Sequence, residues 1–181
     1  MPDYAAFLRG INVGARQAKG AQLRSCLERV GLEDVSTFRA SGNVVFTDPD
    51  GGSADALTGR VEEALADALG YEVVVFLRTA AQTRAIARHE PFPATAVKAS
   101  EGKLQVLLLA KKPAASTRTR ALGEATDEDR LAIRGRELYW LPSGRMRDSG
   151  LDLKAIEDAI GPTTMRTKGT VALMAEKFFS D

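Results

Sequence analysis

The sequence has little of the chemistry that metal centres and nucleophilic sites require. Its 181 residues include one histidine, one cysteine and one tryptophan. A structural zinc site takes about four Cys or His ligands, and no acidic run has the spacing of a calcium-binding loop. We therefore expect no metal and no cofactor. A single cysteine, Cys26, also forms no internal disulfide, which favours a reducing compartment.

Net charge and long apolar runs are lacking as well. The formal charge is +1, which indicates neither a polycation for nucleic acid nor an acidic tail. No stretch approaches the roughly 20 apolar residues that cross a bilayer, and the first residues lack the basic start and apolar run of a signal peptide. We expect a cytoplasmic protein without a nucleic-acid or membrane partner.

Short apolar runs, turn signals and helically spaced apolar residues in the first half predict the element order βαββαβ of a ferredoxin-like fold. Residues 21–30 carry apolar side chains at helical spacing before a glycine, and residues 71–77 are rich in β-branched side chains. The predicted elements are strands at 4–8, 35–40, 44–46 and 71–77, with helices at 21–30 and 53–69.

The second half repeats the order β-α-β-β-α without a visible residue-level repeat. The predicted elements are helices at 79–89, 116–124, 151–160 and 170–179, and strands at 103–110, 130–133 and 137–141. We predict an α/β (α+β) protein of two ferredoxin-like α/β plait halves, residues 1–80 and 81–181. Each half has a mostly antiparallel sheet with helices on one face, and the second has an additional C-terminal helix.

Topology predicts that two loops of the first half meet. A helical crossover makes its first two strands parallel, so the loop after the first and the turn after the second share one edge of the sheet. Residues 9–14 and 41–43 should therefore lie close together. By the same argument, residues 111–112 and 134–136 share an edge in the second half.

The residue types in these loops suit an anion such as phosphate or carboxylate. Glycines permit positive φ and expose N–H groups, and a loop that leads into a helix N-terminus can hold an anion. The competing interpretation is that these residues serve tight turns. The spacing matches neither a Walker loop nor a dinucleotide fingerprint. The candidate ligand-binding residues are Arg9, Gly10, Asn12, Gly14, Arg16, Ser41, Gly42 and Asn43, with Lys19 nearby.

A basic C-terminal cluster is the second candidate. Arg145, Arg147, Arg166 and Lys168 surround the last helices. Thr164, Arg166 and Thr170 would contribute to an anion pocket between the halves, with Arg166 making a two-pronged contact. The alternative is helix capping and solvated arginines.

Other polar and aromatic residues favour structural roles. The carboxylates at 127–129 are expected on a solvated face, and His89 at a helix end is expected in a surface or capping role. Phe46, Phe76 and Trp140 are expected in the core.

Several motifs resemble the bacterial family called domain of unknown function 1697. They are Phe-Leu-Arg-Gly-Ile-Asn-Val-Gly at 7–14, Ser-Gly-Asn-Val-Val-Phe at 41–46, Glu-Pro-Phe-Pro at 90–93, Thr-Met-Arg at 164–166 and Thr-Val at 170–171. The sequence departs from the family pattern at Thr167 and Lys168, where Asn-Trp is usual, and at Ala15, which replaces a second glycine. The resemblance implies two α/β plait halves and no particular activity.

Three hypotheses follow. The first is a module that binds a small anionic or nucleotide-like ligand at the first-half loops. The second is an enzyme, a transferase or hydrolase acting on such a ligand, for which Ser41, Asn43 and Arg166 are the residues to test. The third is an interaction protein that pairs through a sheet edge, including pairing of two copies.

Overall fold

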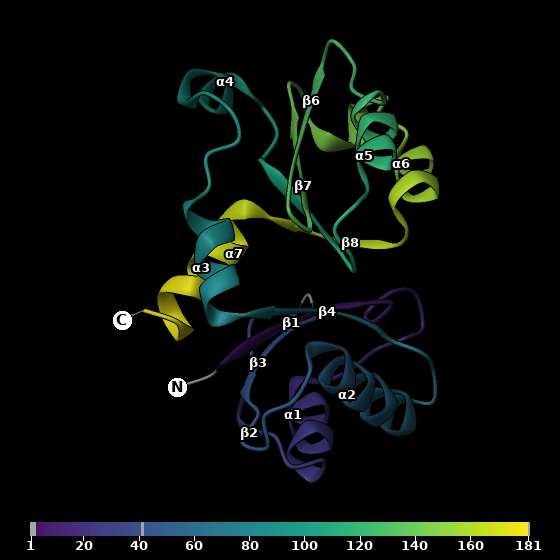
Figure 1. Ribbon diagram of the computed structural model, residues 1–181, viewed down its shortest axis with the longest axis vertical. Coiled ribbons are helices and arrows are strands. Elements are labelled where there is room, and N and C mark those ends of the chain that lie inside the picture. The colour runs from purple at the N-terminus through teal and green to yellow at the C-terminus, as the bar shows by residue number, and fades with distance from the viewer. Residues whose placement is uncertain (1–2, 41, 181) are drawn as a thin grey trace. The chain divides into compact units, whose positions relative to one another are not determined.

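The computed structural model describes residues 3–40 and 42–180. The chain forms two four-stranded antiparallel sheets, drawn with their helices in Figure 1, which confirms the predicted plait halves. The first half of the chain forms, in order, β1 (Tyr4–Arg9), α1 (Gly20–Arg29), β2 (Glu33–Thr37), β3 (Asn43–Thr47), α2 (Ala54–Leu69) and β4 (Val74–Thr79), and its four strands make the first sheet. Its strand order is β2-β3-β1-β4.

The second sheet has the same connectivity, with strand order β6-β7-β5-β8. Its elements are β5 (Gln105–Leu109), α5 (Ala115–Leu122), β6 (Asp129–Arg134), β7 (Glu137–Pro142), α6 (Leu153–Ile160) and β8 (Thr163–Thr167). The remaining helices are α3 (Ala80–Arg88), α4 (Ala94–Ala99), α7 (Lys168–Phe178) and a 3₁₀ turn at Met146–Asp148. The chain divides into a first unit, Met1–Arg84 with Leu173–Asp181, and a second unit, Ala85–Ala172.

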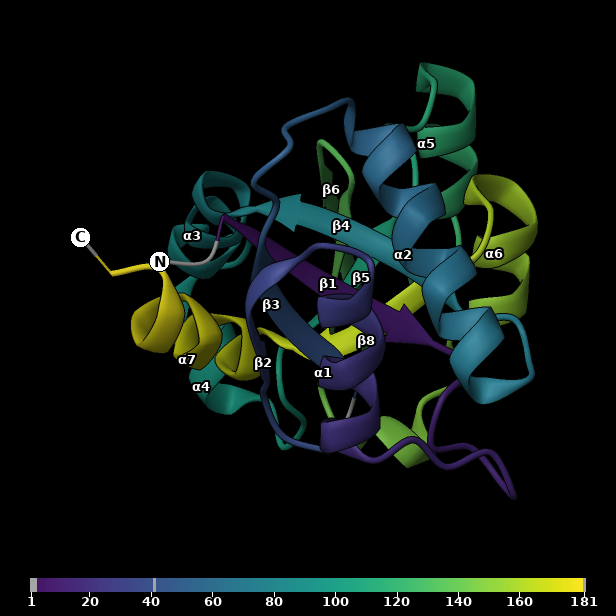
Figure 2. The same ribbon diagram turned by 90° about the horizontal axis from the view of Figure 1, so that it is seen from below.

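The core of the first unit lies between its sheet and two helices. Side chains at every second position of β1 point to one face, so Ala6 and Leu8 are buried there. Leu27 of α1 and Leu65 of α2 are fully buried against them, and Figure 2 shows both helices on this face. Burying each leucine contributes about 1.5–3 kcal/mol. Cys26 belongs to the same core, as predicted, and burial raises the pKa of its thiol.

Helix ends in the first unit follow local rules. Ser53 accepts a hydrogen bond from the Ala56 N–H (3.1 Å) and thereby caps α2. Gly70 ends α2 in the left-handed conformation. In contrast, Lys19 precedes α1 without a capping side-chain bond, and the first turn of α1 has no acidic residue.

The largest correction to the predicted elements is β8. No element is predicted at residues 163–167, yet they form a strand that pairs with β5. Side chains alternate along this edge strand, so Met165 packs on the core of the second unit, while Thr164 and Arg166 on the other face are also buried. A further short helix, α4, was also not predicted. The strand expected at 35–40 is instead β2 and stops before Arg39, whose φ of 58° is left-handed.

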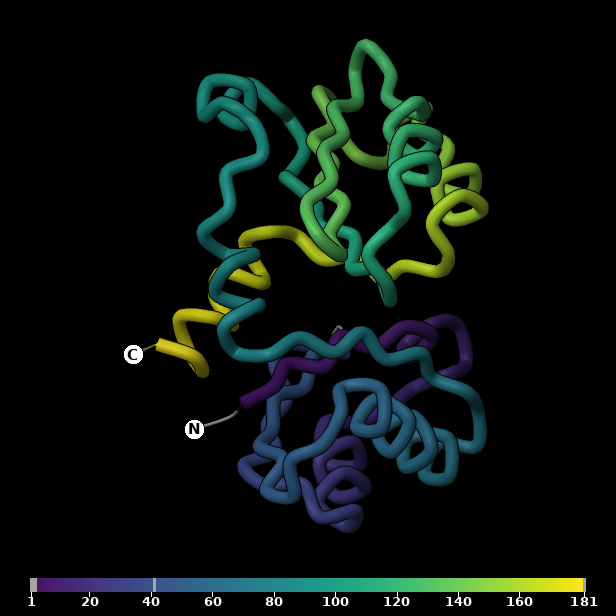
Figure 3. The backbone as a smooth tube through the Cα atoms, viewed as in Figure 1, coloured from purple at the N-terminus to yellow at the C-terminus, as the bar shows by residue number. Residues whose placement is uncertain are grey.

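A short residue-level repeat accompanies the repeated topology, and it was missed in the sequence. Leu77-Arg78-Thr79 ends β4, and Met165-Arg166-Thr167 ends β8. The Thr79 hydroxyl accepts from the Gln82 N–H and the Thr167 hydroxyl from the Thr170 N–H, both at 3.1 Å. Each threonine caps the helix that follows, and Figure 3 traces both strands running directly into those helices.

Candidate anion-binding site

The loop after β1 and the turn after β2 lie side by side, which confirms the predicted proximity. The Asn12 Nδ2 donates to the Ala40 carbonyl at 2.7 Å, and the Leu8 N–H donates to the Gly42 carbonyl at 2.8 Å. In the second unit the Leu109 N–H likewise donates to the Arg136 carbonyl at 2.8 Å. Parallel crossovers therefore bring the two loops together in both units.

Asn12 fixes the loop. Its Oδ1 accepts from the Ala18 N–H at 3.0 Å, so both ends of the side-chain amide are bonded within the protein. Its φ of 53° lies in the left-handed region, which asparagine tolerates better than most residues. Gly10 and Gly14 also have positive φ, and Val13 and Arg16 form an isolated antiparallel bridge beside Gly14. These residues shape the loop.

The turn after β2 is closed by tight packing. A Cβ on Gly42 would lie 2.8 Å from the Ile11 Cδ1, and the φ of Gly42 is 73°. Asn43 is buried, and its Nδ2 donates to the Phe38 carbonyl at 3.0 Å. Ser41, another predicted site residue, lies outside the described residues.

The start of α1 presents unbonded donors beside two cations. Within residues 3–40 and 42–180, the backbone N–H groups of Gly20 and Ala21 have no hydrogen-bond partner. The side chains of Lys19 and Arg16 have no acidic partner in that same part of the chain. The helix N-terminus itself carries partial positive charge. The local potential therefore favours a negatively charged group.

Tyr71 closes this region on the side of α2. The Gln22 Nε2 donates to the Ala68 carbonyl at 3.2 Å, which holds the first turn of α1 against the end of α2. The Arg16 guanidinium stands over the Tyr71 ring, 5.0 Å from its centroid. The Tyr71 hydroxyl is buried and has no hydrogen-bond partner among the residues that the structure describes. An orphaned buried hydroxyl costs about 1–3 kcal/mol unless a water or ligand satisfies it.

We call this set the α1 site: Arg16, Lys19, the N–H groups of Gly20 and Ala21, and the Tyr71 hydroxyl. Arg9 is not included. Neighbouring side chains on a strand point to opposite faces, so Arg9 leaves β1 on the face opposite to Leu8, which packs against the helices. Sequence reasoning identified Arg16 and Lys19 and missed Tyr71, which lies distant in sequence and in no glycine-rich motif.

The second predicted cluster forms the junction of β8 and α7. The Arg166 guanidinium is buried and donates to the Thr164 hydroxyl (2.9 Å) and the Met165 carbonyl (2.8 Å). Burial lowers the pKa of Arg166 to about 10, so it stays charged at neutral pH. The Thr170 hydroxyl shares a hydrogen bond with that of Thr167 at 2.9 Å. An anion-binding role for these residues stays a prediction.

The other arginines and lysines near this cluster pair with acids, and His89 has a cationic neighbour. Arg145 pairs with Asp148 at 2.7 Å, and Lys168 with Glu90 at 2.9 Å. The His89 Nδ1 lies 2.9 Å from an Arg134 guanidinium nitrogen. Partial burial and the charge of Arg134 lower the pKa of His89, which therefore accepts this bond as a neutral ring.

The expectation of a solvated acidic face at 127–129 is wrong for Asp129, which is buried. It is 1% exposed, and its carboxylate accepts hydrogen bonds from Trp140 Nε1 (2.8 Å), the Ser149 hydroxyl (2.7 Å) and the Thr126 hydroxyl (2.8 Å). Burial opposes its ionisation, but these bonds outweigh burial and lower the pKa of Asp129. Trp140 itself is buried, as predicted. Asp129 therefore links Trp140 to Thr126 and Ser149 within the second unit.

The described residues contain neither a metal-ligand cluster nor a membrane-spanning helix. In residues 3–40 and 42–180, no three His, Cys, Asp or Glu side chains gather as a metal site. No helix in this same part of the chain has the length and apolar character needed to cross a membrane.

Comparisons with known proteins give the family and the fold. A conserved bacterial protein from Streptococcus pneumoniae has a similar structure, with a TM-score of 0.69 and 20% sequence identity over 98% of this chain and 99% of that one. At this identity the similarity shows the fold alone. None of the curated proteins matches the sequence. The family described as "Protein of unknown function (DUF1697)" matches residues 1–139. The chain therefore belongs to the DUF1697 family.

Proposed function

We propose that this protein binds a small anionic ligand, a phosphate-bearing metabolite, at the α1 site. The observation that carries the proposal concerns the described residues, among which the N–H groups of Gly20 and Ala21 and the neighbouring Lys19 side chain have no partner. Backbone donors at a helix N-terminus and a lysine charge together form a common protein environment for phosphate.

Arg16 and Tyr71 give the proposal its second support. The Arg16 guanidinium extends the positive charge toward the end of α2, over the Tyr71 ring, whose buried hydroxyl has no hydrogen-bond partner among the described residues. In this arrangement the ligand anion accepts from the helix N–H groups, and Arg16 and Lys19 flank it. Asn12 contributes indirectly, because it fixes the loop that carries Arg16.

Pairing through the first sheet edge is less well supported. The edge strand β2 changes register between Glu33 and Ser36, and Asp34 has a φ of 51°. An irregular edge interrupts the row of backbone groups that a second copy would need. Ligand binding is therefore the function that the first unit favours.

A thermal-shift screen tests the proposal with inorganic phosphate and a panel of phosphorylated metabolites. Ligands that bind only the folded state raise its stability by mass action, so at least one should increase the melting temperature. Lys19→Ala should weaken the binding of that ligand about tenfold, which corresponds to the loss of one charge-assisted hydrogen bond. The matched control is Arg24→Ala, an exposed cation on the same helix. If Lys19→Ala and Arg24→Ala bind the ligand with equal affinity, Lys19 does not contact it and the proposed site is wrong.

A further inference from the structure

Strand β6 presents part of its backbone at an edge of the second sheet. It is the first strand in the order β6-β7-β5-β8, and its register with β7 is unbroken from Asp129 to Arg134. The Ser143 N–H donates to the Glu128 carbonyl at 2.7 Å. Because the bonded and non-bonded positions of an antiparallel pair alternate, the backbone groups of residues 130, 132 and 134 also face β7. Those of residues 129, 131 and 133 face outward.

Two of the outward-facing residues have unbonded backbone groups. Asp129 is not one of them, because its N–H donates to the Thr126 carbonyl (3.3 Å) and its carbonyl accepts from the Thr126 N–H (3.2 Å). Within residues 3–40 and 42–180, the N–H and C=O groups of Leu131 and Ile133 have no hydrogen-bond partner. These groups have the spacing of a strand ladder, so a further strand can add here.

The other edge strands carry features that interrupt such pairing. The Glu62 carboxylate of α2 accepts from the Val75 N–H of β4 at 2.9 Å. In the same way, the Glu157 carboxylate of α6 accepts from the Thr163 N–H of β8 at 3.0 Å. The β2 edge changes register. Among the described residues, β6 is therefore the edge with the best-ordered row of open backbone groups.

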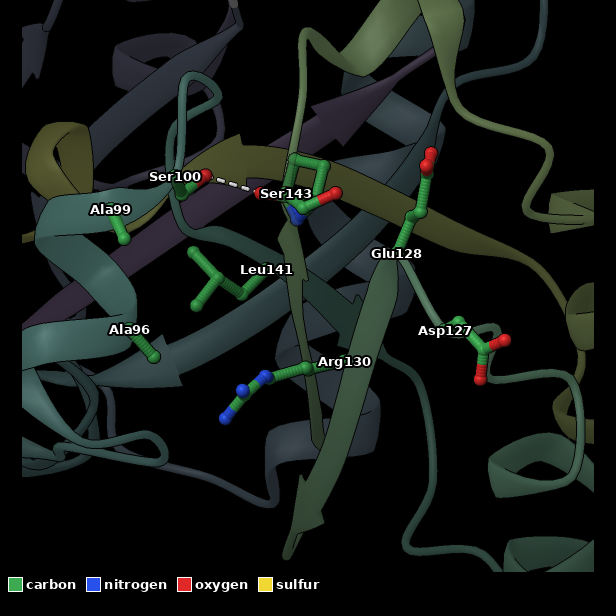
Figure 4. A pocket seen from close by; sticks show the side chains of 9 residues that line it. Ala96, Ala99, Ser100, Asp127, Glu128, Arg130, Leu141 and Ser143 are labelled. Atoms are coloured by element: carbon green, nitrogen blue, oxygen red, sulfur yellow. Dashed lines mark hydrogen bonds between the residues drawn. The ribbon is translucent and has the colours of Figure 1, made fainter.

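Positive charge flanks these open groups. Arg130 and Arg134 lie on one face of β6, and both are exposed. Arg130 lines a pocket between α4 and the strands β6 and β7, where it points toward Ala96 while Glu128 points away from it (Figure 4). The Arg130 side chain has no ion pair or hydrogen bond in the described part of the chain, and Arg134 contacts the neutral His89 ring. Neither arginine is neutralised by an acid there.

This charge pattern disfavours a second copy of the chain as the added strand. Two antiparallel copies of β6 use all the open groups only when Leu131 of each pairs with Ile133 of the other. That register sets Arg130 directly opposite Arg134, and directly opposed like charges destabilise a strand pair. Charged side chains on an edge strand protect it from self-pairing in this way. A strand with acids at the same two positions meets attraction instead.

We propose that the edge of β6 binds an extended acidic segment of a partner protein by β-strand addition. The segment lies antiparallel to β6, and two of its residues exchange backbone hydrogen bonds with Leu131 and Ile133. Acidic residues on either side of these two lie opposite Arg130 and Arg134. Side chains approach most closely at such non-hydrogen-bonded positions. The recognised pattern is therefore two acids separated by three residues of high strand propensity.

The test titrates the full chain with the peptide acetyl-Glu-Val-Thr-Val-Glu-amide and follows the amide signals of the protein. We expect saturable shifts at Leu131 and Ile133. The peptide acetyl-Lys-Val-Thr-Val-Lys-amide reverses both charges and should bind at least about tenfold more weakly. The acidic peptide with both valines N-methylated loses the two backbone donors and should also bind about tenfold more weakly. No saturable shift at Leu131 and Ile133, or equal affinity for the acidic peptide and either control, would overturn the proposal.

Two variants locate the charge effect. Arg130→Gln should weaken the acidic peptide about threefold, which corresponds to the loss of one exposed cross-strand charge pair. Arg118→Gln removes an exposed arginine from α5 and is the matched control, which should bind as the wild type does. Equal affinities of the two variants would contradict the proposed charge pairing.

Sedimentation of the protein without peptide tests the rival occupant. We expect a monomer. A concentration-dependent dimer in which the amide signals of Leu131 and Ile133 shift would overturn the proposal in favour of a second copy at this edge. The phosphate experiment on the α1 site is independent of these results.

Discussion

Asn12 offers the sharpest test of how the loop is held, because glycine and alanine separate its two contributions. Asn12→Gly removes both side-chain hydrogen bonds and keeps the left-handed backbone accessible. Each bond contributes about 0.5–1.5 kcal/mol. Because Asn12 is exposed, the lower value applies, and the two bonds together give about 1 kcal/mol. Asn12→Ala adds the left-handed penalty of roughly 1 kcal/mol and should cost about 2 kcal/mol.

The assay is amide hydrogen exchange at Ala18, whose N–H donates to the Asn12 Oδ1. A loss of about 1 kcal/mol corresponds to roughly fivefold faster exchange in Asn12→Gly. Urea unfolding should place Asn12→Ala below Asn12→Gly in stability. Gln17→Ala, an exposed change in the same loop, is the control and should leave exchange at Ala18 unchanged. Unaltered Ala18 protection in Asn12→Gly would refute the reasoning.

The remaining predictions concern the turn, the second core and the thiol. Gly42→Ala should lower the free energy of unfolding, measured in urea, by about 2–3 kcal/mol, because left-handed backbone strain adds to a close contact with Ile11. The control is Gly51→Ala, whose φ of 60° is also left-handed but whose Cβ meets open space. It should cost only the strain, about 1 kcal/mol. Because the pKa of Asp129 is lowered in the folded state, the stability that its ionised form contributes is present above about pH 4 and is lost as the pH falls below about 4. Asp129→Asn should therefore make the free energy of unfolding depend less on pH below about 4. An unchanged pH dependence would contradict this role. The buried Cys26 thiol, with its raised pKa, should react with a thiol reagent far more slowly in the native protein than in urea, and equal rates would show that it is accessible.

The sequence predicted the fold where periodicity and connectivity agree. Short apolar runs identified β1 and β3, and the helical spacing of α1 and α2 gave the crossovers between strands. The parallel relation of β1 and β2 then placed two loops together without any side-chain information. That step correctly predicted that the two loops lie close together, although not the particular hydrogen bond from Asn12 to Ala40.

What the sequence could not give depends on contacts between distant residues. β8 is an edge strand of mostly polar residues, and only its pairing with β5 defines it. Asp129 becomes a core residue because Trp140 and Ser149 reach it across the second unit. Tyr71 joins the α1 site through a cation–π contact with Arg16, a residue from a different loop.

The α1 site is tested most directly by titrating inorganic phosphate into the full chain and following the amide signals of Gly20 and Ala21. The account predicts saturable shifts at both amides, because their N–H groups donate to the anion, and at least about tenfold weaker binding in Lys19→Ala than in Arg24→Ala. Phosphate that leaves both amide signals unmoved, or shifts them equally in the two variants, would contradict it.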